Sequence, residues 1–322
     1  MIEGGSMAAD VQKFISHART ELGKVIVGQD ETINRMLAVL LCGGHALLEG
    51  VPGIAKTLAV KALAQICRLS FQRVQCTPDL MPADVLGANV FNLSTSTFSL
   101  HRGPVFTDLL LVDEINRVPP RTQSALLEAM EERQVTIDGT GYALSAFFTV
   151  FATQNPIEFE GTYPLPEAQL DRFLFKIRVP YPTPEKEVEI LERYQQGFDP
   201  HHIDALGLSP VDPDWLPAAR REVSALAVEP GIFRYMAAIV QRTRDWPALS
   251  LGGSPRSTVA LMFAAKALAA MEGRDYLIPD DVKAAAPPVL RHRLLVKPEA
   301  ELEGISSDQV VAEVLAAVEV PK

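Results

Sequence analysis

Over the first 180 residues, short apolar runs alternate with stretches of helical periodicity. Apolar residues recur at helical spacing from Asp30 until Gly43 and Gly44, and again from Lys56 to about Arg68. The apolar runs indicate buried strands at 45–50, 71–76, 109–113, 147–153 and 173–179. Strands that alternate with helices are typical of an α/β fold, in which a parallel sheet carries helices on both faces.

Two segments interrupt this alternation. Residues 87–106 are too strand-like for a loop, and they lie between a predicted short helix and the third strand. Residues 133–145 contain Asp138–Gly139, a turn signal flanked by alternating apolar residues. Both segments therefore predict β-hairpins inserted into the α/β core.

The strand signal ends in the proline-rich segment 179–185, which we interpret as a linker. Beyond it the apolar residues keep helical spacing, and Ser254 followed by Pro255 marks a helix start. The sequence thus predicts an α/β domain over residues 1–180 and an all-α domain over residues 185–322. Met7 is a second candidate start, so residues 1–6 carry no expectation about the fold.

Composition narrows the class of protein. The 322 residues are 48% hydrophobic, which is typical of a globular protein, and the net charge of −10 disfavours broad contact with nucleic acid. The three cysteines form no C-x-x-C pair, and no apolar run approaches the ~18 residues of a membrane span. We therefore expect a cytoplasmic protein with reduced thiols.

The stretch EGVPGIAKT (49–57) lies between a predicted strand and a predicted helix. It matches the phosphate-binding pattern G-x-x-x-x-G-K-[ST], except that Ala55 replaces the second glycine. Lys56 would reach the β- and γ-phosphates, Thr57 would hold Mg²⁺, and Ala55 is tolerable if its φ stays negative. The predicted nucleotide-binding residues of the loop are Gly50, Pro52, Gly53, Ile54, Ala55, Lys56, Thr57 and Leu58.

Polar residues follow two of the predicted strands. Asp113 and Glu114 end the run LLLVDE, where Asp113 would orient Mg²⁺ and Glu114 would polarise the attacking water. Asn155 ends the next strand, where its amide would fix that water or contact the γ-phosphate. Each residue alone is also an ordinary strand-end or turn residue, but their order after the loop favours ATP hydrolysis.

Together these motifs resemble those of the AAA+ ATPases, and more narrowly of the MoxR type. Such proteins commonly carry alanine before the loop lysine, and the two predicted hairpins resemble their helix-2 insert and pre-sensor 1 hairpin. The resemblance spans residues 10–318 and is carried by GVPGIAKT (50–57), LLLVDEINR (109–117), TQNPIEFEGTYPLPEAQLDRF (153–173) and SPR (254–256). It implies a P-loop NTPase sheet followed by a helical lid, with ATP and Mg²⁺ as ligands.

Three further assignments come from the resemblance. The segment VIVGQD (25–30) resembles the one that borders adenine, which implies a role for Val27 and Gly28, although a simple helix entry is the alternative. Arg172 resembles an arginine finger supplied by a neighbouring subunit, and a surface or helix-capping arginine is the alternative. Arg256 resembles sensor 2, and whether it acts on its own or a neighbour's nucleotide stays open.

The resemblance implies an ATP-driven chaperone that remodels or matures partner complexes as a ring, by family default a hexamer. A client enzyme complex and a protein with a von Willebrand factor A domain are the implied partners. Three alternatives stay open: a magnesium-chelatase-like motor subunit, a DNA-linked AAA+ motor, and a regulatory module that senses ATP without hydrolysing it.

Overall fold

The structure, a computed structural model of the whole chain, describes residues 9–51, 53–155, 161–200 and 202–321. Its centre is a five-stranded parallel sheet in the order β2-β5-β8-β1-β9. The predicted α/β architecture is therefore confirmed, and all five predicted strands are present. They are β1 (Ala46–Glu49), β2 (Phe71–Gln75), β5 (Leu109–Asp113), β8 (Thr149–Gln154) and β9 (Phe175–Arg178).

Side chains of the sheet alternate between two apolar cores. Leu109 and Leu111 of β5 face a core shared with α1 (Ala9–Gly23), α2 (Asp30–Cys42) and α3 (Lys56–Ile66). Leu110 and Val112 face the other core, which includes α5 (Pro120–Glu132). Burial on both faces explains why β5 reads as an uninterrupted apolar run.

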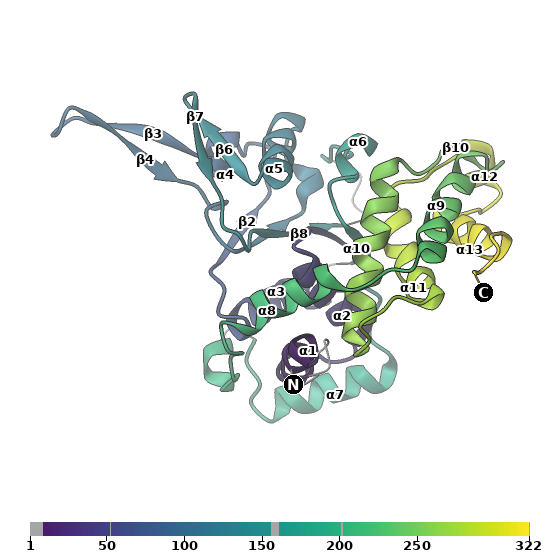
Figure 1. Cartoon of the computed structure of the whole chain (residues 1–322). Helices are drawn as coiled ribbons and strands as arrows, with labels where there is room; N and C mark the ends of the chain where they lie inside the picture. Colours follow the sequence, from purple (N-terminus) through teal and green to yellow (C-terminus); the bar gives the residue numbers. More distant parts are fainter. Residues whose placement is uncertain (1–8, 52, 156–160, 201, 322) are drawn as a thin grey trace, which may run out of the picture.

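Two antiparallel hairpins extend from this core, as predicted. The first pairs β3 (Gly87–Asn92) with β4 (Thr97–Arg102), after the short helix α4 (Pro82–Leu86), and it projects away from the sheet (Figure 1). The second pairs β6 (Gln134–Ile137) with β7 (Thr140–Ala143). Its turn residues Asp138 and Gly139 both have positive φ, +48° and +78°, which explains the Asp-Gly signal.

Beyond β9 the chain is mostly helical, as predicted. One addition is a short antiparallel ribbon of β10 (Leu249–Leu251) and β11 (Leu295–Val296), whose strands are too short to give a periodic signal. In the described part of the chain, no helix is both long enough and apolar enough to cross a membrane. The short helix α6 (Glu167–Leu170) precedes β9. The helices beyond β9 are α7 (Pro184–Gln195), α8 (Trp215–Ala225), α9 (Pro230–Arg244), α10 (Pro255–Met271), α11 (Pro279–Leu290), α12 (Pro298–Leu302) and α13 (Ser307–Ala317).

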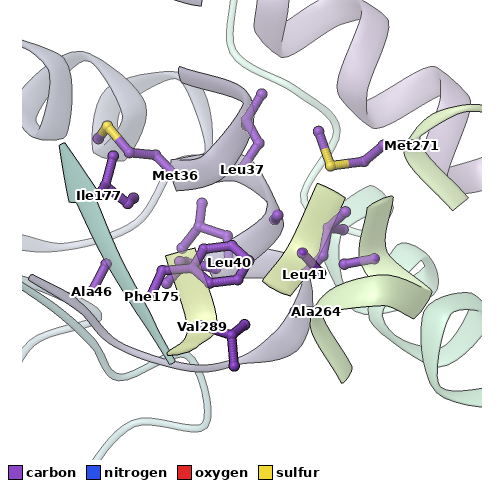
Figure 2. Close-up of a cluster of buried hydrophobic side chains, with 14 of the residues drawn as sticks. Met36, Leu37, Leu40, Leu41, Ala46, Phe175, Ile177, Ala264, Met271 and Val289 are labelled. Atoms are coloured by element: carbon purple, nitrogen blue, oxygen red, sulfur yellow. The ribbon is translucent and has the colours of Figure 1, made fainter. Parts of the chain in front are cut away.

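Helix α2 joins the sheet to the C-terminal helices. In Figure 2 its residue Leu40 lies beside Phe175 of β9, with Val289 of α11 in the same cluster, while Leu41 lies beside Ala264 of α10. All five side chains are buried, with 2% exposure or less. The C-terminal helices therefore share one apolar core with the sheet, which fixes their position relative to the strand ends.

Candidate functional site

The loop between β1 and α3 passes close to neighbouring backbone. A Cβ atom at Gly50 would lie 2.7 Å from the carbonyl oxygen of Val179, so only glycine fits there. Gly53 has φ of +83°, which glycine adopts without strain. Pro52 of the predicted loop lies outside the described residues. Residues 53–55 thus form a turn that leads directly into α3.

Ala55 departs from the expectation of a negative φ. It has φ of +61° and ψ of +20°, immediately before the first residue of α3. A left-handed conformation costs a residue with a Cβ about 1–2 kcal/mol. Successive amides in turn conformations of this kind form a concave nest for anions, so the loop imposes the angle on whichever residue occupies the position. The condition that we placed on Ala55 was therefore wrong.

A cavity of about 390 Å³ opens beside this loop, at the carboxyl ends of β5 and β8. Lys56 and Thr57 reach it from the first turn of α3. Asp113 and Glu114 reach it from the end of β5, and Asn155 from the end of β8. The five side chains that sequence reasoning selected for phosphate, magnesium and water thus line one cavity.

Lys56 lies against the loop that precedes it. Its ammonium group donates to the carbonyl oxygen of Gly50 at 2.6 Å. Burial lowers the pKa of Lys56, while Asp113, Glu114 and Glu49 act in the opposite direction. A phosphate group in the cavity would add negative charge beside the ammonium and would favour its charged form.

Asp113 is the most connected acidic group of the cavity. Its carboxylate accepts from the Thr57 hydroxyl at 3.4 Å and from the Thr153 hydroxyl at 3.2 Å. Arg73 of β2 also donates to it, from Nε at 2.6 Å. Asp113 and Thr57 are thus adjacent, as their assignment to one Mg²⁺ requires, and Arg73 is a cation at the same carboxylate.

Glu114 is held in a left-handed conformation, with φ of +61°. Its backbone amide donates to the Thr153 hydroxyl at 2.8 Å, which ties the end of β5 to β8. Its carboxylate accepts from Arg117 at 2.9 Å and from Gln75 at 3.4 Å. The side chain proposed to polarise water is therefore oriented by two donors.

Sequence reasoning missed Arg73 and Gln75. They stand two residues apart on β2, so they lie on the same face of the strand. That spacing is visible in FQRVQ, but only the pairing of β2 with β5 brings these side chains to Asp113 and Glu114. The local sequence does not determine the order of strands in the sheet. The spacing of Arg73 and Gln75 therefore could not identify them as neighbours of Asp113 and Glu114.

A second cavity of about 350 Å³ adjoins the first, since Gly53, Ala55, Leu58 and Tyr194 line both. Val27 and Ile54 line it as well, whereas Gly28 is not among its lining residues. Gly28 has φ of +69°, and a Cβ atom there would lie 2.9 Å from the Lys186 side chain. The remaining lining residues are largely apolar or aromatic: Val25, Ile26, Gln29, Tyr181, Pro182, Glu187, Ile190, Arg193 and Phe198. This composition suits a flat heterocycle beside a phosphate site.

The two predicted arginines do not line either cavity. Arg172 lies in the turn between α6 and β9 and is partly buried. Arg256 is the second residue of α10, and its guanidinium forms an ion pair with Glu131 at the end of α5. The structure therefore separates both arginines from the nucleotide cavities of their own chain.

The residues of the cavity fit a magnesium ion that accompanies phosphates. Mg²⁺ prefers oxygen ligands and commonly keeps water and substrate phosphates around one or two protein groups. The Thr57 hydroxyl and the Asp113 carboxylate supply such oxygens. Within residues 9–51, 53–155, 161–200 and 202–321 there is no cluster of three or more His, Cys, Asp or Glu side chains that could hold a metal on its own.

Comparisons with known proteins agree with this geometry. Residues 45–175 match the ATPase family associated with various cellular activities (AAA), and residues 241–314 match the AAA lid domain. The chain is 46% identical to YeaC of Bacillus subtilis, covering 97% of this chain and 96% of the relative. It is 44% identical to chaperone MoxR1 of Mycobacterium tuberculosis, covering 98% of this chain and 84% of the relative.

A solved structure has the same fold. The crystal structure of a protein from Cytophaga hutchinsonii has a TM-score of 0.89 and 41% identity, covering 98% of this chain and 97% of that one. Similarity at this level over nearly the whole length includes the sheet, the hairpins and the C-terminal helices. The chain belongs to the MoxR-type AAA+ ATPases.

Proposed function

We propose that this protein binds Mg·ATP in the two adjoining cavities and hydrolyses it to ADP and phosphate. The observation that carries the proposal is the convergence of Lys56, Thr57, Asp113, Glu114 and Asn155 on one cavity beside the loop. The loop amides and Lys56 bind the phosphates, and the apolar cavity that includes Val27 receives the base. Magnesium, when bound, neutralises charge on the β- and γ-phosphates.

Each polar side chain then has a separate task. Thr57 and Asp113 hold the metal, and Glu114 orients and polarises the attacking water. Asn155 fixes that water or contacts the γ-phosphate. Arg172 supplies positive charge to the γ-phosphate of a neighbouring subunit, a contribution of about 10³–10⁵ in rate for arginine fingers. We assign Arg256 to a neighbour's nucleotide too, because it lies outside the cavities of its own chain.

Isothermal titration with ATP and Mg²⁺, together with phosphate release, tests the chemistry. Lys56→Ala should abolish the heat of binding, whereas Glu114→Gln should keep ATP binding and lose hydrolysis by at least a hundredfold. Chelation of Mg²⁺ should stop turnover of the wild type. If Glu114→Gln hydrolyses ATP at the wild-type rate, the protein is instead an ATP sensor whose residue 114 takes no part in catalysis.

We propose further that the protein assembles as a ring, with six subunits as the family default, and works as a chaperone. With a domain boundary near residues 180–185, hydrolysis would shift the packing between the two domains and move the inserted hairpins. A client enzyme complex and a protein with a von Willebrand factor A domain are the proposed partners. The relative named chaperone MoxR1 supports this proposal through its similarity over 98% of the chain.

Capture by a stalled variant tests the chaperone assignment. Glu114→Gln should retain ATP and therefore hold clients during a pull-down from native lysate, with Lys56→Ala as the control that cannot bind ATP. Proteins enriched with the first variant and absent with the second are candidate clients. Enrichment of nucleic acid, or stimulation of turnover by DNA that fades with salt, would favour a DNA-linked motor instead.

A further inference from the structure

The carboxylate of Asp171 is held by two separate segments of the C-terminal helices. Asp171 directly precedes Arg172. Its Oδ1 accepts from Nε of Arg293, which follows α11, at 2.6 Å. Its Oδ2 accepts from the hydroxyl of Ser254, at 3.3 Å, and Ser254 begins the helix that carries Arg256. One side chain therefore connects the turn of Arg172 to the start of α10.

Arg293 holds the same turn through its backbone. Its Nη2 donates to the carbonyl oxygens of Asp171 at 3.1 Å and Phe173 at 2.7 Å, and its Nη1 donates to that of Leu174 at 3.1 Å. These acceptors lie on both sides of Arg172. The Arg293 side chain is only 3% exposed. A buried guanidinium in a rigid fork of donors thus fixes the backbone that carries Arg172.

Ser254 contacts Asp171 without capping its own helix. A serine at the start of a helix normally accepts from a backbone amide of the first turn, which stabilises the helix by about 1 kcal/mol. Ser254 occupies this position before α10, but its side chain makes no such bond. Its hydroxyl donates to Asp171 instead. The side chain of Ser254 therefore connects the start of α10 to the turn of Arg172 and makes no capping bond to its own helix.

We propose that Arg293 is a positioning residue that sets the place of Arg172 and, through Asp171 and Ser254, couples it to Arg256. Among the described residues, the Arg172 side chain has no hydrogen-bond or ion-pair partner, so its placement depends on the turn that carries it. This inference depends on the proposed function, in which Arg172 acts on the ATP of a neighbouring subunit. The two arginines then approach that ATP as one unit.

A nearby arginine provides a matched control. Arg291 is partly buried, with 9% side-chain exposure, and it pairs with Asp308 of α13 at 2.9 Å. It donates to the carbonyl oxygen of Lys176 in β9 at 3.2 Å. Arg291 therefore also joins the C-terminal helices to the sheet, but it makes no hydrogen bond to residues 171–174.

Lysine substitutions separate positioning from general stability. Lysine keeps the charge but cannot reproduce the forked contacts of arginine. Arg293→Lys should lower kcat at least tenfold while the Kd for ATP changes less than threefold and ring assembly persists. Arg291→Lys should lower the melting temperature about as much as Arg293→Lys does, and it should leave kcat within twofold of the wild type. Equal effects of the two variants on kcat would overturn the proposal.

Mixed rings show whether the defect lies in the residue given to a neighbour. Arg293→Lys subunits have an intact cavity and a misplaced Arg172, whereas Glu114→Gln subunits have the opposite defect. Mixing them should restore turnover several-fold above the sum of the separate proteins, as should mixing Arg172→Ala with Glu114→Gln. If mixing with Glu114→Gln restores turnover to Arg172→Ala but not to Arg293→Lys, the positioning role of Arg293 is overturned. The proposed role of Arg172 would then still stand.

The failure of the proposed function has a different signature. If Arg172→Ala itself keeps full turnover, Arg172 does not act as an arginine finger. That result overturns both the proposed role of Arg172 and the positioning role of Arg293. If Arg293→Lys does not fold, Asp171→Asn and Ser254→Ala take its place, because each removes one contact of the same carboxylate. A loss of kcat that recovers in mixed rings supports the coupling, and wild-type kcat in both variants overturns it.

Discussion

At the scale of single residues, Ala55 is held at a backbone angle that favours glycine. Its φ of +61° costs an alanine about 1–2 kcal/mol. Glycine removes that cost, but it gives the unfolded chain more conformational freedom, which destabilises the folded state by about 0.4–1 kcal/mol. Ala55→Gly should therefore leave the free energy of unfolding unchanged or raise it by up to about 1.6 kcal/mol, measured with urea in the absence of nucleotide.

Ala218 is the control for this substitution. It lies in α8 and is partly buried, so Ala218→Gly should cost about 1 kcal/mol of unfolding free energy. An equal loss of stability in the two glycine variants would contradict strain at position 55.

His45 makes stability depend on pH. Its Nδ1 accepts from the amide of Val150 at 2.9 Å and its Nε2 contacts the carbonyl oxygen of Met130 at 3.1 Å, so the neutral ring is the one that fits. Burial lowers the pKa of His45 to about 4. Between about pH 6.5 and pH 4 the unfolded chain binds more protons than the folded one. The contribution of His45 to the free energy of unfolding is therefore fully present above pH 6.5. It is lost as the pH falls from 6.5 to about 4, and the total loss from this group is about 3 kcal/mol.

His45→Gln isolates that contribution, because the buried His292 has a lowered pKa too and changes stability in the same direction. We expect the unfolding free energy of the variant, measured by urea at pH 7, 6 and 5, to fall less steeply than that of the wild type. Parallel curves for the two proteins would show that His45 does not cause the pH dependence.

At the scale of elements, the hairpin of β3 and β4 stands apart from the core. Leu93 is 86% exposed and Phe98 is 71% exposed, and neither lines a nucleotide cavity. Leu93→Ser combined with Phe98→Ser should therefore change the unfolding free energy by less than about 0.5 kcal/mol and leave basal hydrolysis intact. The buried Leu126 of α5 is the contrast, since Leu126→Ala should cost about 2–5 kcal/mol. A double variant that unfolds easily would show that the hairpin belongs to the core.

Elements with strong local signals were predictable from the sequence. The run LLLVD is buried on both faces, and Asp138–Gly139 adopts the positive φ angles of a tight hairpin turn. The contacts of Arg73 with Asp113 and of Arg293 with Asp171 were not predictable, because strand order and helix packing bring distant residues together. The positive φ of Ala55 was not predictable for another reason. The shape of the loop overrides the preference of alanine for negative φ.

At the scale of the whole molecule, the two cavities of one chain are lined by neither of the predicted arginines. These cavities contain the groups that we propose to bind phosphate, metal and water, but Arg172 and Arg256 do not line them. The core around α2 holds α10, the helix that carries Arg256, against the sheet. Completion by a neighbouring subunit is the simplest solution to this geometry.

That solution predicts turnover that depends on protein concentration. Upon dilution below the range in which light scattering detects assemblies, each chain keeps its loop and cavities, so the Kd for ATP should change less than threefold. Turnover per chain should fall at least tenfold, because the charge supplied by Arg172 is lost. The Arg172→Ala variant, already without that charge, should show little dependence on dilution. Constant wild-type turnover per chain across the same dilution range would mean that each chain completes its own site.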